Sequence, residues 1–224
     1  MRKAITTFIL CFCVSLLLNI SGNGMVEAMP ETDPNIKSFI FYVDNSGSMS
    51  LRYHERGSSK MDVAVQLLHA INDETPDMEA NVGIYTYGPH REYRRVIPYD
   101  RDAVTEAFNQ IPTDFAFAGR ITPMGSGIQN LDTTIAALAG PVEFVVITDG
   151  NYNSGDPPEE VIQNVYDRYG DRVCFHFISF AKKSFEKAFV KNLSELNDCS
   201  VMAEAVELLD EAVRADFIAK VFVP

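Results

Sequence analysis

Hydrophobic and polar positions along the chain follow two patterns that predict two kinds of element. Short apolar runs rich in aromatic and β-branched residues, bounded by Gly, Ser, Asn or Asp, predict buried strands. Stretches with apolar residues at three- and four-residue spacing predict helices. We expect strands at residues 37–43, 81–87, 92–97, 143–148, 172–180 and 200–204. We expect helices at residues 60–72, 102–111, 124–139, 157–169, 184–196 and 206–221, the second of them capped by Asp100.

The order of these elements predicts the fold class. Strands alternate with helices along the chain, an order that produces a mostly parallel sheet with helices on both faces. We therefore expect a Rossmann-like, doubly wound α/β fold. No internal repeat or Pro-rich linker divides the sequence after residue 28, which predicts one domain. In open sheets of this kind, ligands bind outside the carboxyl ends of the strands.

The first 28 residues have the pattern of a secretory signal peptide. Arg2 and Lys3 precede an apolar run over residues 4–20, and small residues follow. Val26 and Ala28 fit the −3 and −1 positions of a cut before Met29, although a cut near residue 22 or 24 also fits. An uncleaved anchor helix or a lipoprotein acylated at a cysteine are the alternatives. We expect a signal peptide at 1–28, a short leader at 29–35 and one domain at 36–222, in the periplasm, secreted or at a cell surface. No second apolar span follows cleavage.

Charge excludes two classes of partner. The chain carries 19 basic and 31 acidic residues, a formal net charge of −12. Such a balance argues against nucleic-acid binding, which needs a basic face to displace counterions. It argues equally against docking on an anionic membrane. It favours a protein partner whose surface is basic around a single acidic side chain.

Polar residues gather where predicted strands end. The strand at 37–43 runs into Asp44, Ser46 and Ser48, and the strand at 143–148 runs into Asp149. Thr122 precedes the helix expected at 124–139. The fold would bring these residues to one edge of the sheet, where two carboxylates and three hydroxyls form an all-oxygen site. Hard divalent ions such as Mg²⁺ take oxygen ligands, whereas zinc and copper prefer His or Cys.

These segments resemble the von Willebrand factor A (vWA) domain family. The resemblance lies in FYVDNSGSM, GSSKMDVAVQLL, ITPMGSGIQ and FVVITDG, and it spans about residues 36–222. It implies the vWA fold and a complete metal-ion-dependent adhesion site (MIDAS). The implied metal residues are Asp44, Ser46, Ser48, Thr122 and Asp149. The alternative is that these residues are turn and cap residues that hold no metal.

The resemblance also implies a mechanism of binding. In this family the hydroxyls touch the ion and the aspartates act largely through water, so the ion remains electrophilic. A Glu or Asp side chain of a partner protein then completes its coordination. We expect Mg²⁺, with Mn²⁺ or Ca²⁺ as substitutes, and a partner-binding rim that includes His54, Phe117 and Tyr152. A scaffold subunit of an envelope complex, with or without a stapling metal, is an alternative function.

Enzymatic activity is not expected, and a metal-dependent hydrolase is the least favoured alternative. The sequence lacks a G-x-S-x-G motif and a histidine in a triad context. It also lacks G-x-G-x-x-G after the first strand and a Walker-type phosphate loop, so nucleotide binding has no cradle.

Two cysteines remain after residue 28, Cys174 and Cys199. Export would place them in an oxidising compartment. The sheet order implied by the resemblance puts both at the amino ends of neighbouring strands. We expect a disulfide there, with two buried free thiols as the alternative.

Overall fold

A six-stranded sheet forms the centre of the molecule in the computed structural model, which describes residues 33–53, 57–116 and 120–223. Its spatial order is β3-β2-β1-β4-β5-β6. The strands are β1 (Lys37–Asp44), β2 (Ala80–Tyr87), β3 (Arg91–Pro98), β4 (Val142–Thr148), β5 (Val173–Ser179) and β6 (Met202–Glu204). The expected signal peptide at 1–28 lies outside the described residues.

Strand pairing is parallel everywhere except at one edge. β1 pairs in parallel with β2 and β4, and β5 pairs in parallel with β4 and β6. Only β3 runs antiparallel, against β2. The prediction of a mostly parallel, doubly wound sheet is therefore confirmed, and the run at 92–97 is the edge strand. Parallel pairing brings the carboxyl ends of β1 and β4 to the same edge of the sheet.

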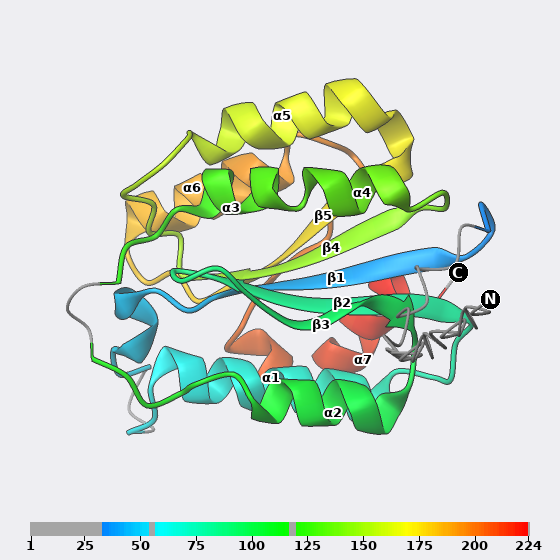
Figure 1. Cartoon of the computed structure of the whole chain (residues 1–224). Helices are drawn as coiled ribbons and strands as arrows, with labels where there is room; N and C mark the ends of the chain where they lie inside the picture. The colour runs from blue at the N-terminus through cyan, green and yellow to red at the C-terminus, as the bar shows by residue number, and fades with distance from the viewer. Residues whose placement is uncertain (1–32, 54–56, 117–119, 224) are drawn as a thin grey trace, which may run out of the picture.

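Helices cover both faces of this sheet (Figure 1). On one face lie α1 (Lys60–Glu74), α2 (Arg101–Asn109) and α7 (Glu211–Val221). On the other lie α3 (Met124–Asn130), α4 (Asp132–Ala137), α5 (Pro158–Tyr169) and α6 (Ser184–Ser194). Short 3₁₀ turns follow β1 (η1, Gly47–Ser50), α5 (η3, Gly170–Arg172) and β6 (η4, Glu207–Leu209).

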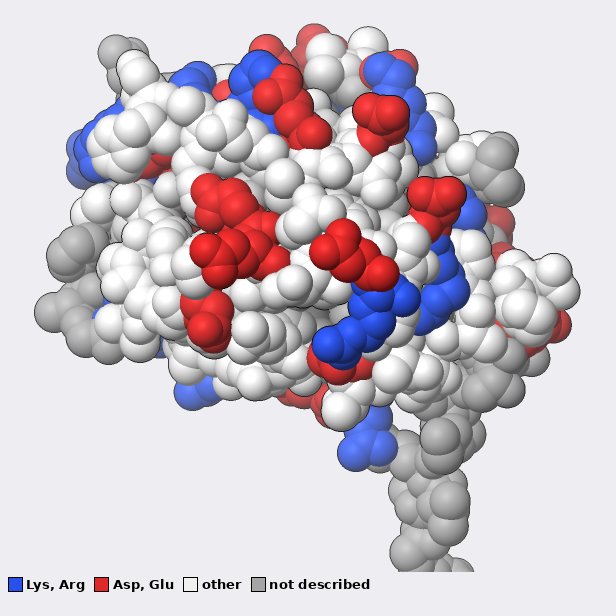
Figure 2. All heavy atoms as spheres, turned by 90° about the horizontal axis from the view of Figure 1, so that it is seen from above, with Lys and Arg blue, Asp and Glu red and all other residues white. Residues whose placement is uncertain are grey.

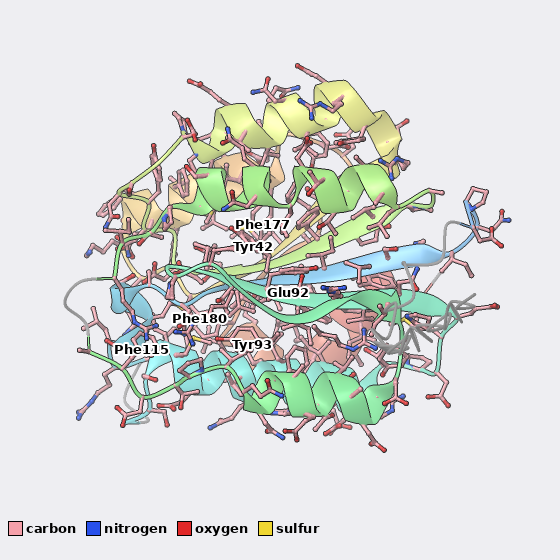
Figure 3. The ribbon with its side chains drawn as sticks, in the orientation of Figure 1. Tyr42, Glu92, Tyr93, Phe115, Phe177 and Phe180 are labelled. Carbon is pink, nitrogen blue, oxygen red and sulfur yellow. A yellow bond between two sulfur atoms is a disulfide. The ribbon has the colours of Figure 1, made fainter. Side chains whose placement is uncertain are left out.

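Alternation along β1 produces two separate apolar layers. Phe39 and Phe41 pack with α1, α2 and α7, whereas Ile40 and Tyr42 pack with α3 to α6. Figure 3 shows Tyr42 and Phe177 on the second side of the sheet and Phe180 on the first. A strand buried on both faces needs apolar residues at successive positions, which is why β1 reads as one continuous apolar run.

Four predicted helices match the structure to within two residues at each end, and two depart from it further. The helix expected at 124–139 is divided at Leu131 into α3 and α4. The last helix begins at Glu211 instead of residue 206, because the Asp210 side chain accepts hydrogen bonds from Ala212 and Val213 and caps it there. The predicted cap at Asp100 is present, since its side chain accepts from the backbone N–H of Ala103 at 2.7 Å.

The predicted disulfide is present at the amino edge of the sheet. Cys174 in β5 is bonded to Cys199, which lies before β6, with the two Cα atoms 6.1 Å apart. The bond ties two neighbouring strands together at the edge opposite the end of β1.

In the part of the chain that the structure describes, no helix has both the length and the apolar character needed to cross a membrane.

Candidate metal centre

The five predicted site residues lie on three loops at the carboxyl edge of the sheet. Asp44 ends β1, and Ser46 and Ser48 belong to the turn at η1. Asp149 follows β4 directly, and Thr122 lies just before α3. Because β1 and β4 are parallel neighbours, Asp44 and Asp149 leave the sheet side by side.

Hydrogen bonds fix the first loop around Asp44. One carboxylate oxygen accepts the backbone N–H of Ser46 at 2.9 Å, and the other lies 3.4 Å from the Thr148 hydroxyl, which donates to it. The hydroxyls of Ser46 and Ser48 are 3.2 Å apart. Two hydroxyls and a carboxylate thus converge on a small volume.

The loop that carries Thr122 contacts both of the other loops. The Gly47 N–H donates to the Arg120 carbonyl at 3.4 Å. The Thr122 N–H donates to the Asn153 side chain at 2.9 Å. Gly88 allows the loop that carries Thr122 to lie close to the end of β2, since a Cβ at Gly88 would lie 2.6 Å from the Ile121 carbonyl oxygen. The φ of Gly88 is +69°, a conformation that glycine adopts without strain. The three loops are therefore held together by backbone groups and by the Asn153 side chain.

Both carboxylates are fully buried, which makes their charges costly. Burial and the negative charge of Asp149 raise the pKa of Asp44 to about 7, against hydrogen bonds from Ser46 that favour ionisation. A nearby cation would remove this cost.

One such cation belongs to the chain itself. The Lys60 ammonium lies 2.5 Å from a carboxylate oxygen of Asp149, and its side chain is 5% exposed. Asn151 donates to the other oxygen through its backbone at 3.1 Å and its side-chain amide at 3.0 Å. Two aspartates face one lysine, so the cluster keeps one uncompensated negative charge whenever both carboxylates are ionised.

Sequence analysis did not identify Lys60. It stands 89 positions before Asp149 and opens α1, where a capping box between Ser59 and Asp62 fixes the helix start. A lysine at the start of a predicted helix carries no signal of a distant carboxylate. Only the predicted boundary at residue 60 offered a hint.

The donor set fits a hard divalent cation. Two carboxylates and three hydroxyls are oxygen ligands, and no His or Cys lies among them. Asp44, Ser46, Thr122 and Asp149 are buried, whereas Ser48 is partly exposed. The cluster is thus reachable from solvent on the Ser48 side.

Of the three predicted rim residues, only Tyr152 can be placed. Its side chain is 36% exposed, and its hydroxyl donates to the Gly155 carbonyl at 3.0 Å. Its ring lies nearly parallel to that of Phe189, at 6.4 Å between centroids. His54 and Phe117 lie outside the described residues.

A groove of about 650 Å³ lies elsewhere, between α3 and α5. Its lining includes Ile128, Val161 and the ion-paired Asp132 and Arg168. None of the five candidate metal residues lines it.

Comparison with known proteins identifies the fold. No protein-family model and no curated protein matched the sequence. Solved structures did match, among them an aerotolerance-related membrane protein from Bacteroides fragilis with multiple mutations to serines. That match has a TM-score of 0.62 at 15% identity and covers 83% of this chain and 100% of that one.

Two further matches name the fold and the site. The VWA domain of SpRpn10 aligns with a TM-score of 0.54 at 14% identity, over 84% of this chain and 96% of that one. A proximal thread matrix protein from the mussel byssus, with a zinc-occupied MIDAS motif, also has a TM-score of 0.54 at 14% identity. That match covers 80% of this chain and 47% of that one.

The chain accordingly has the fold of a von Willebrand factor A domain, as the motifs predicted.

Proposed function

We propose that the chain is an exported protein-binding module. Asp44, Ser46, Ser48, Thr122 and Asp149 hold a divalent ion, and an acidic side chain of a partner protein completes its coordination. The observation that carries the proposal is the position of these five residues on three adjoining loops at one edge of the sheet, with both carboxylates buried. The similarity to a protein with a zinc-occupied MIDAS motif supports a divalent ion.

Each group of residues has a separate task. The bound ion supplies an electrophilic position for a carboxylate. Ser46 and Ser48 offer neutral oxygens, which leave that electrophilicity largely undiminished. Asp44 and Asp149 supply negative charge, and Asn151 fixes the orientation of Asp149 through two hydrogen bonds. Lys60 neutralises part of the aspartate charge and so limits how strongly the centre binds any cation.

Calorimetric titration of Mg²⁺ into chelator-stripped protein tests this proposal, with Mn²⁺ and Ca²⁺ as comparators. We expect saturable binding that Ser48→Ala weakens, because the substitution removes one partly exposed ligand oxygen. The matched control is Ser50→Ala, because the Ser50 hydroxyl bonds to the Gly47 carbonyl and lies outside the proposed ligand set. Equal binding by both variants would contradict the ligand assignment.

A metal-independent scaffold is the second candidate, and the Lys60–Asp149 ion pair favours it. This contact supplies a cation to the cluster and holds α1 against the β4 loop without any ion. A scaffold of this kind would show no saturable binding of Mg²⁺, Mn²⁺ or Ca²⁺ and would capture the same partners in chelator. Hydrolysis stays the least favoured function, since it would need a general base beyond the two aspartates.

Export is the remaining part of the proposal. A disulfide at Cys174–Cys199 is typical of an oxidising compartment, which agrees with the signal-like pattern at residues 1–28. Expression of the full chain in a secreting bacterial host, followed by fractionation and mass measurement, tests it. We expect a periplasmic or secreted product that begins at Met29. A membrane-bound product that retains residues 1–28 would contradict cleavage.

A further inference from the structure

A small pocket adjoins the candidate metal centre. It has a volume of about 260 Å³ and is lined by Ser48, Leu51, Arg52, Lys60, Asn151, Lys182, Lys183 and Glu186. Ser48 is a proposed metal ligand, and Lys60 and Asn151 both contact Asp149. A molecule that reaches the ion from solvent on this side therefore passes along the pocket wall.

Basic residues dominate this lining, and its one acidic residue is already engaged. Glu186 accepts the backbone N–H groups of Lys182 and Lys183, each at 3.0 Å, and its other oxygen lies 2.8 Å from the Lys183 ammonium. Although burial opposes its ionisation, these hydrogen bonds hold its pKa at about 2. Glu186 thus serves as a cap for the loop before α6 and pairs with Lys183, so its charge offsets the other cations only in part.

Arg52 and Lys182 remain as two positive charges at the mouth of the pocket. The Lys182 ammonium donates to the Arg52 carbonyl oxygen at 2.8 Å and lies 5.4 Å from the centroid of the Tyr53 ring. Within the described ranges, no carboxylate forms an ion pair with either side chain. Burial and the positive charge of Lys60 lower the pKa of Lys182, so an anion placed here would relieve a repulsion between cations.

We propose that this pocket binds a second carboxylate of the same partner, which rests on the proposed function. The partner would present an acidic segment in which one Glu or Asp reaches the ion and a neighbouring Glu or Asp reaches Arg52 and Lys182. The net charge of −12 favoured a partner that is basic around one acidic side chain. The charge of the pocket lining is opposite in sign, and at short range it outweighs distant charges that salt screens. Figure 2 shows that, on the face covered by α3 to α6, basic side chains lie at both ends and acidic ones gather near the centre.

Glycine peptides with blocked termini test this inference. They are added to Mg²⁺-loaded protein that is purified after expression of the full chain. One peptide carries a single glutamate, and the others carry two glutamates separated by zero, one or two glycines. Nuclear magnetic resonance titration of ¹⁵N-labelled protein gives each affinity, with and without chelator. We expect the best two-glutamate peptide to bind about fivefold more tightly than the single-glutamate peptide, the gain of one exposed ion pair.

Two double variants locate that gain. Arg52→Gln/Lys182→Gln should abolish the fivefold difference and leave the affinity for the single-glutamate peptide unchanged. Lys191→Gln/Lys220→Gln removes the same charge from exposed positions on α6 and α7 and should keep the difference.

The remaining outcomes separate this inference from the proposed function. If the single-glutamate peptide binds only with Mg²⁺ and a second glutamate adds nothing, the proposed function stands and the pocket inference is overturned. If two-glutamate peptides bind equally well in chelator, the pocket binds acid and the metal-dependent function fails. If no peptide binds, both are overturned.

Discussion

The amino ends and the carboxyl ends of the parallel strands form two edges of the sheet. These two edges differ in how their charged groups are paired. At the amino edge, His176 and Glu143 form a contact of 3.1 Å, and Lys37 lies 3.4 Å from the same carboxylate. The other ring nitrogen of His176 accepts the Val201 N–H at 3.1 Å, which places the ring proton on the nitrogen that faces Glu143. Every polar group in this cluster has a partner within the chain.

The carboxyl edge leaves its cluster incomplete. Lys60 pairs with Asp149, and burial together with repulsion from Asp149 raises the pKa of Asp44 to about 7. At the amino edge, by contrast, the pKa of Glu143 is lowered, because hydrogen bonds from His176 and Lys37 and the charge of Lys37 overcome burial. A cluster whose charges are all paired within the chain (closed) contributes to stability. A cluster that keeps an unpaired charge (open) is available to a ligand. The edge that we propose as functional is thus the one whose charges the fold does not balance.

Cys174 also belongs to the amino cluster, since its sulfur lies within 4.8 Å of potential ligand atoms of Glu143 and His176. That sulfur is bonded to Cys199, and both imidazole nitrogens have partners. The same three residue types that suit zinc elsewhere are here already engaged within the chain.

Lys60→Met should have the largest effect on stability, and it acts at the carboxyl edge. It leaves Asp149 buried beside Asp44 without a counter-charge, so we expect the free energy of unfolding in chelator to fall by about 3–5 kcal/mol. Saturating Mg²⁺ should restore much of that loss. Urea unfolding with and without Mg²⁺ measures both effects, and Lys191→Met is the exposed control. A loss that Mg²⁺ leaves untouched would show that Lys60 does not share its place with an ion.

The double variant Cys174→Ser/Cys199→Ser tests the closed edge. It opens a covalent loop of 26 residues, counting both cysteines (199 − 174 + 1), so we expect a loss of roughly 3–4 kcal/mol. Mg²⁺ affinity should stay the same, because the disulfide lies at the opposite edge. Denaturant titration and calorimetry on the same sample measure the two quantities. A large change in Mg²⁺ affinity would mean that the edges are coupled.

Glu186→Gln tests a carboxylate that lies at the carboxyl edge but whose two oxygens both have hydrogen-bond partners. Its pKa of about 2 in the folded chain lies below its ordinary value of 4.5. Its contribution is therefore present above pH 4.5 and is lost as the pH falls toward 2. We expect the variant to lose about 2 kcal/mol at pH 7 and much less near pH 2. A loss that does not depend on pH would point to packing instead of charge.

The smallest expected effect concerns the rim. Tyr152→Ala removes a half-exposed ring, so we expect less than about 1 kcal/mol of lost stability. Combined with Phe117→Ala, it should weaken Mg²⁺-dependent binding of the single-glutamate peptide several-fold, as loss of aromatic anchors does. Affinity for Mg²⁺ itself serves as the control and should not change. Unaltered peptide affinity would remove both residues from the predicted rim.

The sequence by itself determined the strands, the order of the elements and the edge at which the polar residues gather. Those features depend on local pattern: β1 is apolar at successive positions because it is buried on both faces, and Asp44 follows where the run ends. Motif spacing also indicated the fold, which the structural matches confirm. The pairing of Cys174 with Cys199 followed from the resemblance, because it depends on which strands are neighbours.

Only the tertiary structure decided how the charges are distributed around the site. The Lys60–Asp149 contact, the engagement of Glu186 by its own loop, and the exposed charges of Arg52 and Lys182 join residues from separate elements. The sequence pattern also did not predict the division of the helix at Leu131. Hydrophobic periodicity reports which face of an element is buried, but it carries no information on which distant side chain lies opposite. Electrostatic balance depends on the distances between charged groups. The packing of α1 and α6 around the sheet sets those distances.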